Sequence, residues 1–129
     1  FGLGISVMAQ VDGYFYKDDR KAVVEIKGRT KYYESFDTHL MEVDKYDAIV
    51  ADATSNGIKS AFYACFFGED VLYLYNVGLI KNHSDKEKKW CPKTTASQSE
   101  YCLKDCYMIH KDIAQVYIKI NGKWMKSVN

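Results

Sequence analysis

Hydrophobic and polar side chains alternate along much of the chain, which is the pattern of half-buried strands. The clearest alternation covers residues 21–27, with Ala22, Val24 and Ile26 on one face and Val23, Glu25 and Lys27 on the other. A shorter strand is expected before it, at 13–17. We expect Gly28-Arg29 to turn the chain and 30–36 to return as a strand.

The middle and the end of the chain predict further strands. Residues 37–46 fit a short strand or a helical turn, and the run from Tyr46 to Ala53 alternates again. Asn56-Gly57 suits a tight hairpin turn, because both residues tolerate positive φ. Residues 58–67 end apolar on both faces, which indicates a central strand. More strands are expected at 71–77, 113–120 and 123–128, the last two joined by a second hairpin signal, Asn121-Gly122.

A helical signal follows a polar segment in the second half. Residues 81–96 are charged and contain the one proline, Pro92, so we expect a long surface loop there. Ser97-Gln98-Ser99-Glu100 has the form of a capping box, which predicts a helix over about 98–109. On that helix Cys102, Cys106 and Ile109 would share one face.

These elements predict a β-dominated fold, either all-β or α+β. The expected architecture is an antiparallel sandwich or open barrel of about seven or eight strands, with one helix in the C-terminal half. The chain has 129 residues, the size of one ordinary domain, and we assign 11–129 to a single β-rich domain. Strands and helices do not alternate, which argues against a parallel nucleotide-binding sheet.

The first ten residues suggest export. They carry no charge and are rich in small and apolar side chains, and Val7 and Ala9 fit a signal-peptidase site before Gln10. Residues 1–10 are therefore interpreted as a signal-peptide remnant, with an N-terminal arm or first strand as the alternative. No apolar run in the sequence is long enough to span a membrane.

The cysteines are candidates for disulfides in an exported protein. There are four, Cys65, Cys91, Cys102 and Cys106, and the sequence does not decide their pairing. Because Cys102 and Cys106 would lie one turn apart on a helix, we expect each to bond elsewhere, to Cys91 or Cys65. One disulfide with a buried free Cys65 is an alternative. A second alternative is a zinc site of Cys91, Cys102, Cys106 and His110.

Tyrosines supply the candidate binding surface. The chain contains eleven, and alternation places part of them on the solvent face of the sheet. The surface we expect comprises Tyr73, Tyr75, Tyr117 and Tyr32. Exposed tyrosine rings bind glycans or proteins well, because they offer area at a small entropic cost. Cross-strand pairing that stabilises the sheet is the alternative role.

Catalytic and nucleic-acid-binding signals are weak. The net charge is +1 with interspersed signs, and the lysine cluster at 86–93 is diluted by acidic residues, so no nucleic-acid partner is expected. His39 lies among acidic residues and could serve acid–base catalysis in a small enzyme. No cofactor is indicated. The sequence favours a non-catalytic, extracytoplasmic (secreted or periplasmic) module that binds a protein, a glycan or an envelope component.

Overall fold

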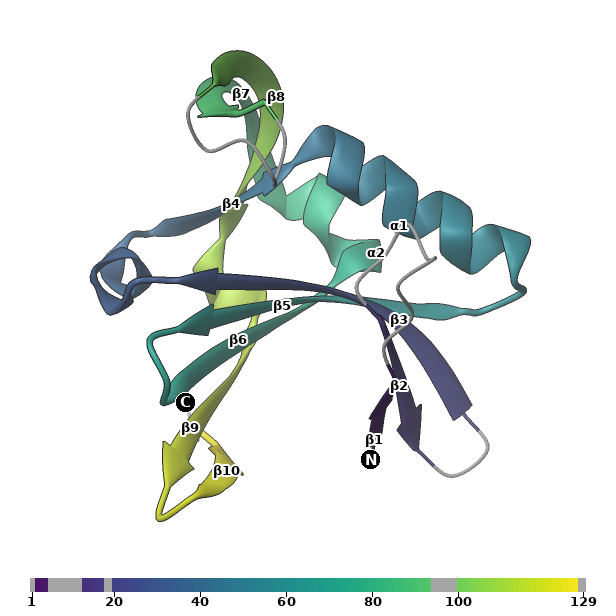
Figure 1. The fold of residues 1–129 in the computed structure, drawn as a ribbon, viewed down its shortest axis with the longest axis vertical. Helices are drawn as coiled ribbons and strands as arrows, with labels where there is room; N and C mark the ends of the chain where they lie inside the picture. Colours follow the sequence, from purple (N-terminus) through teal and green to yellow (C-terminus); the bar gives the residue numbers. More distant parts are fainter. Residues whose placement is uncertain (1, 5–12, 18–19, 94–99, 128–129) are drawn as a thin grey trace.

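The structure is a computed structural model that describes residues 2–4, 13–17, 20–93 and 100–127. Strands are the most common element among these residues (Figure 1). Their bounds are β1 Gly2–Gly4, β2 Gly13–Lys17, β3 Arg20–Arg29, β4 Thr38–Glu42, β5 Ser60–Phe67, β6 Val71–Asn76, β7 Ser84–Pro92, β8 Tyr101–His110, β9 Gln115–Ile120 and β10 Lys123–Lys126.

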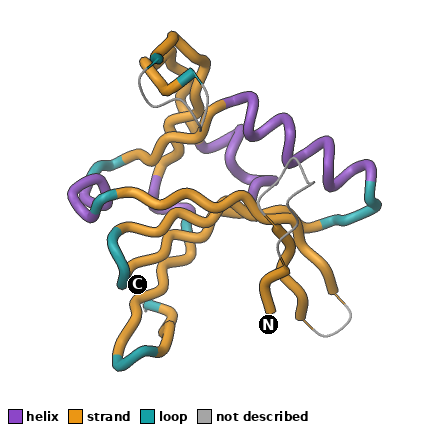
Figure 2. Tube along the Cα trace, in the orientation of Figure 1, coloured by secondary structure: helices purple, strands orange, loops and turns teal. Residues whose placement is uncertain are grey.

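Two α-helices and three 3-10 turns connect these strands in the described part of the chain. They are α1 Val43–Ser55, α2 Val77–Ile80, η1 Lys31–Ser35, η2 Lys81–His83 and η3 Lys111–Ile113. Figure 2 shows the two α-helices on the same side of strands β3, β5 and β6. No helix in the described ranges is long and apolar enough to cross a membrane.

The strands form two sheets. The larger has the order β1-β2-β3-β5-β6-β9-β10, and the smaller has the order β4-β8-β7. All neighbouring pairs are antiparallel except β3 and β5, which are parallel. This parallel pair needs a crossover connection, and η1, β4 and α1 supply it. The prediction of a β-dominated fold is confirmed in its α+β form.

The core lies between the larger sheet, α1 and the smaller sheet. The larger sheet contributes Val23, Tyr63, Cys65, Phe67 and Tyr75 to the core. The helices and the smaller sheet contribute Met41, Ile49, Ile80 and Ile109. In α1, Ile49 and Ala53 lie four residues apart and are both buried. The helix thus turns one apolar stripe toward the sheet.

Several expected elements are present where the sequence placed them. Strands occur at 13–17, within 58–67, at 71–76 and at 115–120. Asn121 and Gly122 have φ angles of 51° and 78°, as a two-residue hairpin between β9 and β10 requires. The strand predicted at 21–27 is β3, but it continues through Arg29 instead of turning at Gly28.

Four expected elements are wrong. Residues 30–36 contain the 3-10 turn η1, and the strand expected at 46–53 is helix α1. The loop expected over 81–96 contains strand β7, and the helix expected over 98–109 is strand β8, which pairs with β4 on one side and β7 on the other. Pairing on both sides satisfies the β8 backbone and overrides its local helical signal. The capping serines lie outside the described residues.

The expected signal-peptide remnant falls largely outside the described residues. Of residues 1–10, the structure describes Gly2–Gly4, which form β1 and pair with β2.

Candidate active site

Three charged residues occupy the core-facing side of β3. Glu25, Lys27 and Arg29 pair in register with Tyr63, Cys65 and Phe67 of β5, and these three partners belong to the core. Side chains that are opposite in register point to the same side of a sheet. Glu25 and Arg29 are half-buried and Lys27 is exposed, and charged residues on the side of a sheet that carries the core often mark a functional site. This stretch of β3 is therefore the first candidate for a functional site.

A pocket lies where these side chains emerge. It has a volume of about 130 Å³ and is lined by β3, by the end of β4, by the first turn of α1 and by Tyr63. The charged lining residues are Glu25, Lys27, Arg29, Glu42 and Lys45. Ligand pockets for small molecules usually measure about 300–1,000 Å³. This pocket has room for a phosphate group or a hydrated ion, and not for a whole nucleotide.

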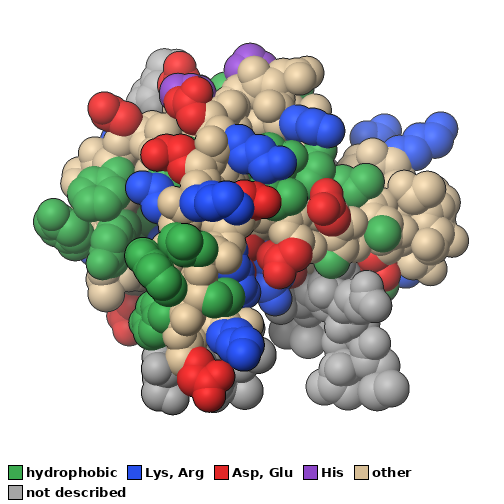
Figure 3. All heavy atoms as spheres, turned by 90° about the horizontal axis from the view of Figure 1, so that it is seen from above, with side chains coloured by type: hydrophobic (Ala, Val, Ile, Leu, Met, Phe, Trp, Pro, Cys, Tyr) green, Lys and Arg blue, Asp and Glu red, His purple; other side chains and the backbone are tan. Residues whose placement is uncertain are grey.

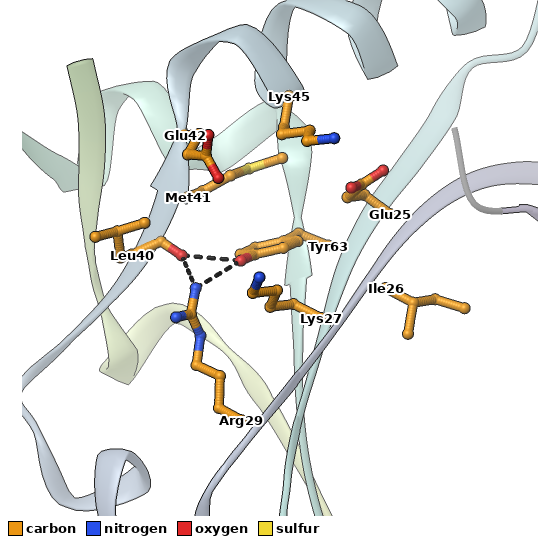
Figure 4. A pocket seen from close by; sticks show the side chains of 9 residues that line it. All are labelled: Glu25, Ile26, Lys27, Arg29, Leu40, Met41, Glu42, Lys45 and Tyr63. Atoms are coloured by element: carbon orange, nitrogen blue, oxygen red, sulfur yellow. Dashed lines mark hydrogen bonds between the residues drawn. The ribbon is translucent and has the colours of Figure 1, made fainter. Parts of the chain in front are cut away.

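Figure 4 shows how the charged groups are placed around the pocket, with Glu25 and Glu42 on opposite sides of it. Glu25 and Lys27 come from β3, while Glu42 and Lys45 come from the β4–α1 junction, and the Lys45 side chain extends toward the side of Glu25. Two carboxylates and two ammonium groups thus surround one opening. Such a mixed set suits a ligand that carries both a cation and an anion.

Arg29 closes one end of the pocket. Its Nη2 donates hydrogen bonds to the carbonyl oxygen of Leu40 at 2.7 Å and to Tyr63 Oη at 3.2 Å. Tyr63 Oη in turn donates to the Leu40 carbonyl at 2.8 Å. Arg29 Nε is buried and has no hydrogen-bond partner in the structure. The guanidinium is therefore fixed in place with a donor left over.

Glu42 is held by an ion pair behind the pocket wall. Lys104 Nζ of β8 donates to Glu42 Oε1 at 2.7 Å, and both side chains are largely buried. The hydrogen bond to Glu42 outweighs partial burial and raises the pKa of Lys104. An ion pair between two strands of the smaller sheet thus positions a carboxylate that lines the pocket.

The donor set fits a divalent cation of the magnesium type. Mg²⁺ usually binds one or two carboxylates and completes its shell with water and substrate phosphate oxygens, and Glu25 and Glu42 are two such carboxylates. A site built wholly from protein ligands is not supported, because the described residues contain no cluster of three or more His, Cys, Asp or Glu side chains that could hold a metal.

The pocket was not predicted, because the alternation of residues 21–27 placed Glu25 and Lys27 on the solvent face. The alternation of Ala22, Val24 and Ile26 favoured that side as the buried one. In fact Val23 and Val24 are both fully buried, so β3 is covered on both faces there. The sequence signal for the site is the charged residue at every second position after Val23, namely Glu25, Lys27 and Arg29.

His39 is not in a polar turn. It lies on β4, is 3% exposed, and its Nδ1 is 2.6 Å from Tyr75 Oη. Burial, with smaller contributions from the positive charges of Lys111 and Arg29, lowers its pKa from 6.5 to about 4. His39 is a neutral core residue at pH 7, and the expected acid–base enzyme built on it is not supported.

The expected tyrosine surface does not exist as such. Tyr73 and Tyr75 are buried in the core, at 8% and 0% exposure, because β6 turns these positions toward α1 and β4. Tyr117, on β9, is half-buried, and Tyr32, on η1, is exposed. These four residues do not share one face.

The cysteines do not form the expected disulfides. Cys65, Cys91, Cys102 and Cys106 are all free thiols. The nearest pair is Cys91 and Cys106, whose sulfur atoms are 3.8 Å apart. Burial raises the pKa of Cys65 to about 11, and burial together with Cys91 raises that of Cys106 to about 12. Both thiols are therefore protonated at neutral pH.

The alternative zinc site is not supported by the structure. Within the part of the chain that the structure describes, no cluster of three or more His, Cys, Asp or Glu side chains could hold a metal. His110 instead faces Asp85, with 3.5 Å between Nε2 and Oδ2. Cys91, Cys102, Cys106 and His110 therefore do not form one metal site.

Comparison with known proteins gives one solved structure to report. No family model matches the chain, and no curated protein matches it significantly. Among solved structures, the chain is similar to Hjc, a Holliday junction resolvase from the archaeal hyperthermophile Archaeoglobus fulgidus. The TM-score is 0.48 at 14% sequence identity, and the match covers 88% of this chain and 73% of the resolvase.

The structure corrects the expectation of an extracytoplasmic binding module without a nucleic-acid partner. The residues on which this expectation depended do not support it, because the cysteines are free and Tyr73 and Tyr75 are buried. A nucleic-acid partner was not expected because the sequence shows no basic face, whereas Lys27, Arg29 and Lys45 converge on one pocket.

Proposed function

We propose that the chain is a divalent-metal-dependent phosphodiesterase that acts on nucleic acid, with its active site in the β3 pocket. The observation that carries the proposal is the emergence of Glu25 and Lys27 from one side of β3 into a pocket that Glu42 and Lys45 also line. Carboxylates beside lysines suit the hydrolysis of a phosphodiester, because they can hold a cation and an anionic phosphate together.

Each residue has a role that its position supports. Glu25 and Glu42 would hold the cation through their carboxylate oxygens. When bound, this metal would polarise the phosphate and lower the pKa of a coordinated water. Lys27 and Lys45 place positive charge at the opening, where charge develops on the phosphate oxygens during hydrolysis. Lys104 acts behind Glu42 as a positioning residue, through the 2.7 Å ion pair.

The pocket size favours a polymer over a free nucleotide. At about 130 Å³ the cavity accommodates a phosphate group, while the sugar and base of the same nucleotide would lie outside it. A backbone that passes over the surface can present one phosphate in this way.

The test is a cleavage assay on labelled single-stranded, duplex and branched DNA and on RNA, with Mg²⁺ or Mn²⁺ and with a chelator. We expect cleavage of at least one substrate with metal, none with chelator, and a loss of about 100-fold or more in Lys27→Met. Lys86→Met, an exposed lysine of β7, is the matched control and should cleave normally. Absence of cleavage for every substrate with both metals would contradict the proposal.

A further inference from the structure

An exposed aromatic cluster lies at the end of β3. Tyr32, Tyr33 and Phe36, on and directly after η1, are 70%, 46% and 44% exposed. Their rings contact one another edge to face, with centroids 5.3, 5.3 and 5.5 Å apart. We call these three residues the η1 platform. Figure 3 shows hydrophobic side chains gathered at the left edge of the molecule, the side on which η1 lies in Figure 1.

The η1 platform is rigidly supported although it is exposed. Ser35 Oγ donates to the Tyr32 carbonyl at 3.0 Å, and Lys111 Nζ donates to the carbonyls of Glu34 and Ser35 at 3.4 Å. At the base of η1, Lys31 pairs with Asp70 at 3.1 Å. The rings are therefore held in place without being covered, which lowers the entropic cost of binding a flat partner.

The η1 platform follows the C-terminal end of β3, the strand that carries the proposed active site. Lys27 and Arg29 project from the same side of β3, and η1 begins two residues after Arg29. At about 3.3 Å per residue, the start of η1 is about 10–15 Å from Lys27. That span is at most about four nucleotides, because one strand of a duplex advances 3.4 Å per nucleotide and an unpaired strand can be more extended.

Arg29 lies between the pocket and the platform and adds a fixed positive charge there. Its Nη2 is held by hydrogen bonds to Leu40 and Tyr63. A guanidinium is always charged and therefore attracts a phosphate group. Proteins that bind single-stranded nucleic acid combine positive charge along the backbone path with aromatic faces on which bases stack. The pocket supplies the first feature and the η1 platform the second.

We propose that the η1 platform stacks unpaired bases of the nucleic-acid strand whose backbone enters the β3 pocket. This inference rests on the proposed function and adds the form of its substrate, a strand with unpaired bases within a few nucleotides of the cleaved phosphate. Stacking on an aromatic side chain tolerates every base, because each has a flat π-face. The platform therefore selects for unpaired structure and not for sequence.

The test uses oligonucleotides that carry 2-aminopurine at successive positions, with Ca²⁺ in place of Mg²⁺. We expect quenching at bases within about four nucleotides of the cleaved bond. Tyr32→Ala should abolish this quenching and weaken binding of the strand by about 5- to 100-fold. Tyr32→Trp should restore both. Trp90→Ala, which removes another exposed ring (69%) on β7, is the matched control and should change neither.

The outcomes separate this inference from the proposed active site. If Glu25→Gln abolishes cleavage with Mg²⁺ while Tyr32→Ala leaves quenching and affinity unchanged, the inferred base stacking on the platform is contradicted and the proposed active site is supported. If quenching depends on Tyr32 but cleavage does not depend on Glu25, the base stacking is supported and the proposed active site is contradicted. Loss of self-association in Tyr32→Ala, without any quenching in the wild type, would assign the surface to a second copy and overturn the inference.

Discussion

Lys104 Nζ lies 2.7 Å from Glu42 Oε1 and joins two neighbouring strands of the smaller sheet at the wall of the pocket. Lys104 belongs to β8, and Glu42 is the last residue of β4, directly before α1. The two side chains are only 19% and 16% exposed, so removal of one leaves the charge of the other incompletely hydrated.

We therefore predict that Lys104→Met lowers the free energy of unfolding by about 1–3 kcal/mol, the cost of an unsatisfied charged group. In the Glu42→Gln background, Lys104→Met should lower the free energy of unfolding by less, because no carboxylate at position 42 is then left without its partner. Urea denaturation of the four proteins measures this coupling. Lys88→Met is the control, since its pair with Asp105 is exposed and should contribute less than about 1 kcal/mol. Equal effects of Lys104→Met in both backgrounds would contradict the prediction.

The buried hydrogen bond between His39 and Tyr75 gives a second prediction. Tyr75 Oη lies 2.6 Å from His39 Nδ1, and Tyr75 is fully buried. Tyr75→Phe leaves a buried ring nitrogen without its partner, so the free energy of unfolding should fall by about 1–3 kcal/mol. Tyr73→Phe is the comparison, because the Tyr73 ring contacts His39 at 4.8 Å but its hydroxyl does not hold the imidazole. A Tyr73→Phe loss as large as that of Tyr75→Phe would show that ring packing, not this bond, is responsible.

His39 also predicts how stability changes with pH. Burial lowers its pKa from 6.5 to about 4, so between these values the unfolded chain binds a proton that the folded chain excludes. Stability should therefore fall as pH decreases from about 6.5 to 4, by roughly 3 kcal/mol at about 1.4 kcal/mol per pKa unit. Denaturation at pH 7 and pH 4.5 measures the slope.

The matched variants are His39→Asn and His83→Asn. The first should flatten this part of the pH profile, and the second should not, because His83 is exposed on η2. A profile that keeps its slope without His39 would assign the acid sensitivity to other groups.

Much of the sheet could be predicted because alternation is a local property. Residues 58–67 and 71–76 form β5 and β6 as expected, and the apolar end of β5 matches its central position. The helix over 43–55 was missed because Ala48, Ile49, Val50 and Ala51 are apolar on both sides and fit either period. Its real signal was the spacing of Val43, Tyr46, Ile49 and Ala53, which repeats every three to four residues.

The site could not be predicted because it depends on non-local pairing. Packing against β5 and α1 determines which side of β3 faces the core. Alternation alone predicted the side of Ala22, Val24 and Ile26, whereas the pocket lies on the side of Glu25 and Lys27. Likewise, β8 carries a helix-like spacing of Cys102, Cys106 and Ile109, but its neighbours β4 and β7 come from distant parts of the chain. Local propensity is a weak guide where strands pair on both sides.

The most direct test of the account is the rate at which Glu25→Gln cleaves a labelled nucleic acid that the wild type cleaves with Mg²⁺. The substitution keeps the shape of the side chain and removes its charge. Glu87→Gln on the exposed part of β7 is the control. We predict a rate at least about 100-fold below wild type for Glu25→Gln, with unchanged stability to urea, and a normal rate for Glu87→Gln. Wild-type cleavage by Glu25→Gln would contradict the assignment of the β3 pocket as the active site.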